Sequence, residues 1–151
     1  SSTRLRRALR DGNLQAASEM LGRSYTVMGT VVRGEQLGRK LGAPTANIML
    51  GNQQLPPDGV YAVTATIGEG KETHRGVANL GVRPTVNGER RLLEVHLLDF
   101  EGDLYEAGVE VYFGLRLRSE KKFKDQEELK KQIRRDLEEA RELFKQSKAG
   151  I

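Results

Sequence analysis

Residues 25–117 consist of short apolar or β-branched runs separated by turn residues, and this pattern constrains the fold more than any other feature. The runs predict strands over residues 25–32, 59–67, 73–80, 91–100 and 109–117. Reversals between them are expected at Asp58-Gly59, Asn87-Gly88 and Glu101-Gly102. Five or six strands at this spacing are typical of a small antiparallel barrel.

Residues 109–117 give the clearest strand, because apolar residues alternate there with polar or small ones. One face of this strand is expected to belong to the core. The predicted core residues are Val109, Val111, Phe113, Leu115 and Leu117.

A long helix is predicted after the last strand, and it is expected to lie across the barrel. Asp125 followed by Glu128 resembles a capping box at its start. Its apolar residues recur at spacings of four, four, three and four, as on one face of a helix. They are Leu129, Ile133, Leu137, Ala140 and Phe144.

The length of 151 residues suits one domain with a short appendage. Residues 1–22 predict two short helices, with Thr3 as a cap for the first and Asp11-Gly12 as its end. The domain itself is expected over residues 23–151. Residues 25–117 contain no internal repeat.

The chain contains no cysteine, which excludes disulfides and cysteine-ligated zinc and favours an intracellular location. No apolar run approaches the roughly 20 residues that a membrane-spanning helix needs. We therefore expect a soluble, cytoplasmic protein with no membrane partner. The 25 Lys and Arg against 21 Asp and Glu permit an anionic partner, but the two signs are interleaved and favour a mixed, solvated surface.

Two common kinds of site fit the sequence poorly. The stretch around Gly70-Lys71 resembles the end of a Walker A loop, but Ala65 stands where the first glycine is needed. His74 and His96 are the only histidines, and they lack a matching set of metal ligands, so a histidine-based zinc site is not expected.

The stretch GTVVRGEQLGRKLGAPTAN, residues 29–47, contains the parts of a nucleotide-phosphate site. Its glycines let the backbone approach a ligand, and Arg33, Arg39 and Lys40 supply charge for phosphates. Thr45 and Asn47 offer neutral oxygens for Mg²⁺. The proline and the small residues predict a loop over residues 38–48. From the residues alone, a glycine-rich hairpin without a ligand stays open.

A single acidic residue stands in the middle of a strongly apolar strand. Period-two alternation places Leu93, Val95 and Leu97 on one face, and Glu94 with His96 on the other. The carboxylate is either solvated on the outer face or held in a cleft, where it could act as a base. The spacing alone leaves both positions open.

Five motifs occur in the order and approximate spacing of the riboflavin kinase family: GRKLGAPTAN, GVYAV, GVANLGVRPTV, LEVHLLDFEGDLY and LRLRSEKKFKDQEELKKQIRRDLEEA. They resemble the kinase module at the C-terminal end of bacterial bifunctional riboflavin kinase/FMN adenylyltransferase (FAD synthetase), over about residues 21–144. The resemblance implies a mainly β fold, a six-stranded antiparallel Greek-key barrel with a long C-terminal helix. It further implies transfer of the ATP γ-phosphate to the ribityl 5′-hydroxyl of riboflavin, giving FMN and ADP, with both substrates on the outside of the barrel.

The same resemblance implies roles for residues on the nucleotide side. Thr45 and Asn47 would hold Mg²⁺, and Thr45 would also contact the nucleotide. Gly34 and Arg39 lie on the loop that would cover the nucleotide, and Tyr105 would lie near it.

On the flavin side, the resemblance makes Glu94 the catalytic base and places Arg118, Lys121 and Phe123 near the flavin. The opening SSTRLR resembles the end of an FMN adenylyltransferase module, so residues 1–22 are expected to be a linker and remnant of such a module. No FMN adenylyltransferase activity is therefore expected.

Two other classes of protein were weighed. A non-catalytic flavin-binding barrel would need neither Glu94 nor the pair Thr45 and Asn47. A nucleic-acid-binding barrel would need exposed aromatic side chains among basic residues, whereas the four Tyr and four Phe stand mostly at core-like positions. We therefore expect no nucleic-acid partner.

Overall fold

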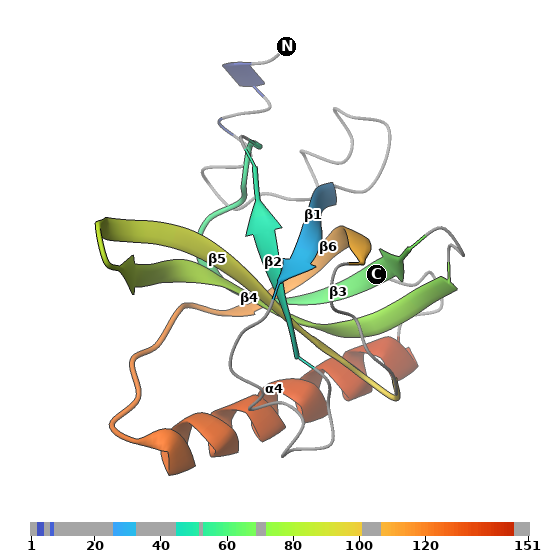
Figure 1. Ribbon diagram of the computed structural model, residues 1–151. Helices are drawn as coiled ribbons and strands as arrows, with labels where there is room; N and C mark the ends of the chain where they lie inside the picture. The colour runs from blue at the N-terminus through green and yellow to red at the C-terminus, as the bar shows by residue number, and fades with distance from the viewer. Residues whose placement is uncertain are drawn as a thin grey trace.

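The computed structural model describes residues 3–4, 7, 26–32, 45–51, 53–68, 72–100 and 107–146. Residues 3, 4 and 7 are helical, and the rest of the two predicted N-terminal helices lies outside the described residues. The described part contains six strands and one long helix (Figure 1). They are β1 (Thr26–Val32), β2 (Thr45–Leu50), β3 (Gly59–Ile67), β4 (Glu72–Thr85), β5 (Gly88–Leu97), β6 (Gly108–Arg118) and α4 (Gln126–Gln146).

The strands form a closed barrel in the order β1-β2-β5-β4-β3-β6, and all neighbours are antiparallel. This order is not sequential, because β5 lies between β2 and β4, and β3 lies beside β6. The connection from β2 to β3 therefore crosses to the other side of the barrel, as in a Greek key. The predicted fold, a six-stranded antiparallel barrel with a C-terminal helix, is confirmed.

The interior of the barrel is filled by the inward-facing residues of every strand. On β5, Leu93, Val95 and Leu97 are buried inside, as the alternation predicts, while Glu94 and His96 face outward. Tyr61 and Phe113 meet edge to face, with ring centroids 5.1 Å apart.

A second apolar cluster joins the outer face of β3 and β4 to α4, which runs along one side of the barrel (Figure 1). Four of the five residues of the predicted apolar stripe of α4 are buried in this cluster, and the fifth, Leu129, packs against it. The Glu128 N–H donates to Asp125 Oδ1 at 2.9 Å, and Lys124 N–H donates to Glu128 Oε2 at 3.1 Å, so the predicted cap is present.

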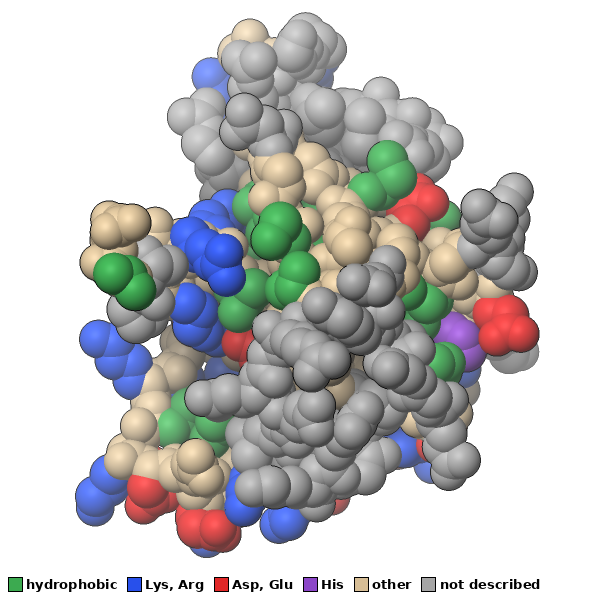
Figure 2. Space-filling model, viewed as in Figure 1, with side chains coloured by type: hydrophobic (Ala, Val, Ile, Leu, Met, Phe, Trp, Pro, Cys, Tyr) green, Lys and Arg blue, Asp and Glu red, His purple; other side chains and the backbone are tan. Residues whose placement is uncertain are grey.

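Acidic and basic side chains are interleaved on the exposed side of α4, at the bottom of the view in Figure 2. This agrees with the mixed surface expected from the sequence. No helix in the described part of the chain is long and apolar enough to cross a membrane.

The prediction of a loop over residues 38–48 is wrong at its C-terminal end, because residues 45–50 form β2. Ala46 and Ile48 are buried in the barrel, so the segment alternates like any other strand.

The boundaries of β4 and β5 also differ from the prediction. Strands β4 and β5 pair up to the turn, with Thr85 opposite Gly88, so β4 ends later and β5 begins earlier than expected. Strand β5 ends at Leu97 instead of residue 100. Asp99 has a φ of 54°, a left-handed conformation that does not continue a strand.

The core prediction for β6 fails at Leu115, which is 55% exposed. Tyr61 pairs with Arg116 and Val63 with Phe113, so two steps along β3 correspond to three along β6. This bulge breaks the alternation after Phe113. Leu117 packs against the second cluster instead of entering the barrel.

Candidate active site

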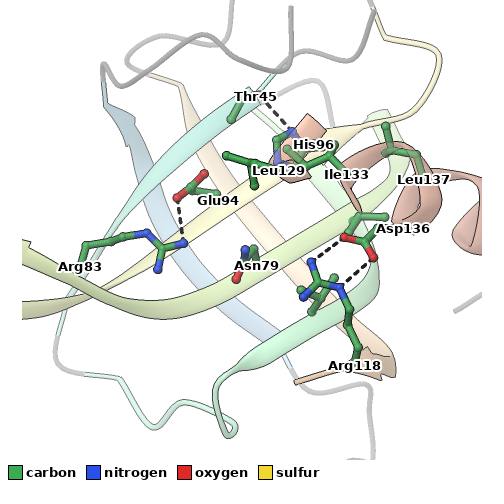
Figure 3. Close-up of a pocket in the computed structure, with 12 residues that line it drawn as sticks. Thr45, Asn79, Arg83, Glu94, His96, Arg118, Leu129, Ile133, Asp136 and Leu137 are labelled. Carbon is green, nitrogen blue, oxygen red and sulfur yellow. Dashed lines mark hydrogen bonds and ion pairs between the residues drawn. The ribbon is translucent and has the colours of Figure 1, made fainter. Parts of the chain in front are cut away.

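A cavity of about 160 Å³ lies between the outer face of the barrel and α4 (Figure 3). Apolar side chains of β3, β4 and α4 form part of its wall. Its polar side chains include Thr45, Asn79, Arg83, Glu94, His96 and Arg118. These residues come from β2, β4, β5 and β6, so the barrel closure brings together parts of several distant motifs.

A row of register partners crosses the barrel at the level of Glu94. On one side, Asn47 of β2 is the partner of Glu94. On the other side, Asn79 of β4 is the partner of Glu94, Val60 of β3 follows, and Arg118 of β6 ends the row. The predicted metal ligand, the predicted base and a predicted flavin-side residue therefore share one line across the outer face.

Thr45 and His96 form the neighbouring pair of the same two strands. Thr45 Oγ1 lies 3.0 Å from His96 Nδ1. Burial lowers the pKa of His96 to about 4, and the negative charge of Asp136 opposes this shift. The imidazole is therefore neutral at neutral pH, and its hydrogen bond fixes the position of the Thr45 hydroxyl.

The Glu94 side chain lies in the cavity wall and is 26% exposed. Of the two positions that the sequence left open, the structure gives the cleft. Arg83 Nη2 lies 3.3 Å from Glu94 Oε1 and holds one carboxylate oxygen. The carboxylate is thus oriented by Arg83 and partly shielded from solvent.

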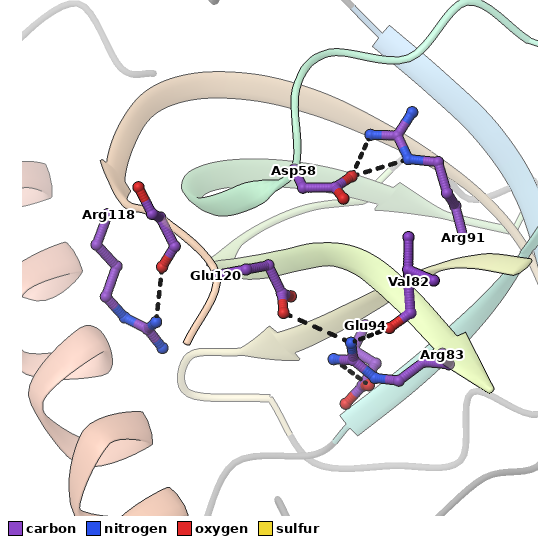
Figure 4. Close-up of polar contacts among 8 residues, drawn as sticks. Asp58, Val82, Arg83, Arg91, Glu94, Arg118 and Glu120 are labelled. Carbon is purple, nitrogen blue, oxygen red and sulfur yellow. Dashed lines mark hydrogen bonds and ion pairs between the residues drawn. The ribbon is translucent and has the colours of Figure 1, made fainter. Parts of the chain in front are cut away.

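Arg83 also reaches a second carboxylate, which links the wall of the cavity to the segment before α4 (Figure 4). Its Nη1 lies 3.6 Å from Glu120 Oε2. Burial raises the pKa of Glu120, and the charge of Arg83 opposes this shift. Neither residue was predicted to belong to the site. Both stand within motifs of the resemblance, Arg83 in GVANLGVRPTV and Glu120 in LRLRSEKKFKDQEELKKQIRRDLEEA, and these motifs were the available signal.

Arg118 is held by a carboxylate of α4. Its Nε and Nη2 lie 2.9 and 2.8 Å from the two oxygens of Asp136, which is only 3% exposed. This bidentate pair fixes the guanidinium at the cavity. Asp136 was also missed, because in the sequence it looks like one more acidic residue of a solvated helix face.

The three predicted flavin-side residues gather around one aromatic ring. Arg118 Cζ and Lys121 Nζ each lie 5.9 Å from the centroid of the Phe123 ring. Of the three, Arg118 lines the cavity. Gly34, Arg39 and Tyr105, predicted on the nucleotide side, lie outside the described residues.

A family model described as riboflavin kinase (flavokinase) matches residues 21–144. Over 144 residues the chain is 48% identical to the bifunctional riboflavin kinase/FMN adenylyltransferase of Haemophilus influenzae and 49% identical to that of Escherichia coli. Each alignment covers 95% of this chain and 46% of the relative. The chain thus spans about half the length of the curated relatives it matches.

Two solved structures share the fold. One is described as a macrolide-efflux protein from Streptococcus pneumoniae, with a TM-score of 0.81 and 38% identity over 93% of this chain and 46% of that one. The other is riboflavin kinase from Trypanosoma brucei, with a TM-score of 0.57 and 26% identity over 80% of this chain and 79% of that one.

Proposed function

The chain belongs to the riboflavin kinase family, and we propose that it transfers the γ-phosphate of ATP to the ribityl 5′-hydroxyl of riboflavin, giving FMN and ADP. The observation that carries this proposal is the pairing of Asn47 with Glu94 beside the cavity under α4. A phosphate-side amide and a carboxylate base are adjacent there.

In the proposed step, the bond from the 5′-oxygen to the γ-phosphorus forms while the bond from that phosphorus to the β,γ-bridging oxygen breaks. ADP leaves with the electron pair of the broken bond, and the hydroxyl proton passes to Glu94. Arg83 holds Oε1 of this carboxylate and leaves Oε2 to take the proton. Positioning of the two substrates supplies most of the remaining catalysis.

The proposed Mg²⁺ ligands fit the requirements of that ion. Thr45 and Asn47 are two residues apart on β2, so their side chains project from the same face, next to Glu94. Because His96 is neutral, its Nδ1 can accept a hydrogen bond from the Thr45 hydroxyl, which leaves the lone pairs of Thr45 Oγ1 for a metal. Thr45 and Asn47 would hold the ion, which would offset the charge of the ATP phosphates and needs few protein ligands.

The remaining assignments belong to the same proposal. Arg118, Lys121 and Phe123 contact the flavin, with Arg118 at the end of the row that starts at Asn47. Gly34, Arg39 and Tyr105 contact the nucleotide. Residues 23–151 form the kinase domain, and residues 1–22 are a linker and remnant of an upstream FMN adenylyltransferase module, which fits a family match that begins at residue 21. The cytoplasmic location expected from the sequence stays a prediction.

The test is to incubate the purified chain with riboflavin and Mg-ATP and to quantify FMN and ADP by chromatography. We expect equal amounts of the two products. Flavin binding without either product would contradict the proposal and favour a non-catalytic flavin-binding barrel.

A further inference from the structure

Asn79 places an amide oxygen in the cavity wall without a hydrogen-bond partner. Its Oδ1 is shielded from solvent and accepts no hydrogen bond from the described part of the chain. On β4, the next residue on the same face toward the N-terminus is Val77. The register partner of Asn79 on β3 is Val60. Neither valine side chain offers a donor. A buried amide oxygen left unpaired is costly, so a donor beyond the described part of the chain is expected, and the cavity that Asn79 lines has room for a ligand that supplies it.

The position of Asn79 in the row of register partners limits what that donor can be. Asn79 lies one strand from Glu94 and two strands from Arg118, and Figure 3 shows it between them. Neighbouring strands are about 5 Å apart. A ligand that extends from Glu94 to Arg118 therefore passes Asn79 at about one strand spacing from its reacting group.

A second shielded acceptor lies close to Asn79. Glu120 Oε1 also lacks a hydrogen-bond partner among the described residues. It sits against Gly81, two residues along β4 from Asn79. The amide oxygen of Asn79 can only accept, and the ionised carboxylate of Glu120 accepts as well, so ligand groups that donate would satisfy both. The phosphates of a nucleotide are acceptors and do not satisfy them, whereas the hydroxyls of a polyol chain do.

We propose that Asn79 is a specificity-determining residue that accepts a hydrogen bond from the 4′- or 3′-hydroxyl of the ribityl chain. This inference rests on the proposed function, because it takes the 5′-hydroxyl to lie at Glu94. One strand step from Glu94 then corresponds to a hydroxyl one or two carbons back along the chain. Asn79 thereby selects flavins that carry the polyol over flavins that lack it.

The experiment compares riboflavin with 3′-deoxyriboflavin and 4′-deoxyriboflavin as substrates of the parent protein and of Asn79→Ala. We expect the parent to lose about tenfold in kcat/KM on one of the two analogues, the worth of one neutral hydrogen bond. On riboflavin, Asn79→Ala should lose the same factor in kcat/KM. On the analogue that the parent uses poorly, its kcat/KM should equal that of the parent. The KM for ATP should stay unchanged.

Val77→Ala is the matched control, because it shortens a neighbouring side chain in the same cavity wall without removing a hydrogen-bonding group. It should lower kcat/KM on riboflavin and on both analogues by one common factor. If Asn79→Ala shows the same parallel loss, the amide only fills space or holds a water, and the inference is wrong.

The parent protein alone also tests the inference, in case Asn79→Ala does not fold. Equal kcat/KM values of the parent on riboflavin and both deoxy analogues would exclude the hydrogen bond. Absence of FMN from riboflavin itself would instead overturn the proposed function, so the two failures are distinguishable.

Discussion

Asn47 and Glu94 are direct register partners on β2 and β5, although they come from motifs far apart in the sequence. Both side chains face outward, and Asn47 is 8% exposed. Paired side chains on antiparallel strands lie about 5 Å apart, close enough for one to bind a phosphate-bound metal while the other accepts a proton.

Glu94→Gln keeps the shape of the side chain and removes its proton affinity. We expect kcat to fall by about 10²–10⁴-fold, the usual worth of base catalysis. The riboflavin Kd and the melting temperature should change little. Turnover, flavin titration and a thermal melt measure the three effects, and a kcat within about threefold of the parent would remove Glu94 from the mechanism. Glu89→Gln, an exposed change on the same strand, is the control and should leave kcat unchanged.

Asn47→Ala removes a proposed metal ligand from the outer face of β2. We expect the concentrations of Mg²⁺ and ATP needed for half-maximal rate to rise about tenfold or more, with the fold retained. Initial rates over a grid of both concentrations show this effect, and circular dichroism checks the fold. Asn87→Ala, in the exposed turn between β4 and β5, should change neither requirement. If Asn47→Ala is largely unfolded and its remaining folded molecules keep the parent rate, Asn47 is only structural.

Asp136→Ala leaves Arg118 without its buried carboxylate partner. We expect a loss of about 3 kcal/mol in the free energy of unfolding, since removing one partner of a buried pair strands the other charge. Flavin affinity should fall as well, because the guanidinium is no longer held at the cavity. Denaturant unfolding and flavin titration measure both effects.

Two further variants separate stability from binding at this pair. The double variant Asp136→Ala with Arg118→Met should recover part of the lost stability and none of the flavin affinity. Arg141→Ala breaks the exposed pair with Asp99 and should cost about 1 kcal/mol or less. Parent-like stability of Asp136→Ala would show that the pair is not a support of the fold.

The depressed pKa of His96 predicts a loss of stability in acid. The folded-state pKa is about 4 and the ordinary value is 6.5, so between these values the unfolded chain binds a proton that the folded chain does not. The free energy of unfolding therefore falls as the pH drops through this window, by up to about 3 kcal/mol. Urea unfolding across the window should show the loss in the parent and in His74→Gln, and a reduced loss in His96→Gln. An unchanged pH dependence in His96→Gln would assign the effect to other groups.

The 151-residue chain should not convert FMN to FAD. Its match to the bifunctional relatives covers 46% of their length and includes the residues matched by the kinase family model. With FMN and Mg-ATP as the only substrates, chromatography should detect no FAD. FAD formation above a no-protein control would overturn the assignment of residues 1–22 as a remnant.

The side of a strand on which each side chain lies was predictable, because it depends on local periodicity. Leu93 and Val95 enter the barrel and Glu94 does not, since successive side chains of a strand point to opposite sides. The same reasoning failed at Leu115, where a bulge in the pairing of β6 with β3 interrupts the alternation. A bulge depends on the partner strand, which the sequence of β6 alone does not specify.

The sequence by itself determined five of the six strands, the apolar stripe of α4 and the motifs that resemble riboflavin kinases, because each is written in contiguous residues. Only the tertiary structure decided which residues meet. Arg83 comes to lie between Glu94 and Glu120, and Asp136 comes to hold Arg118, through the strand order β1-β2-β5-β4-β3-β6 and the packing of α4 on the barrel. Hydrogen bonds and charge pairs act over a few ångströms of space, so residues distant in the sequence become partners only when the barrel closes.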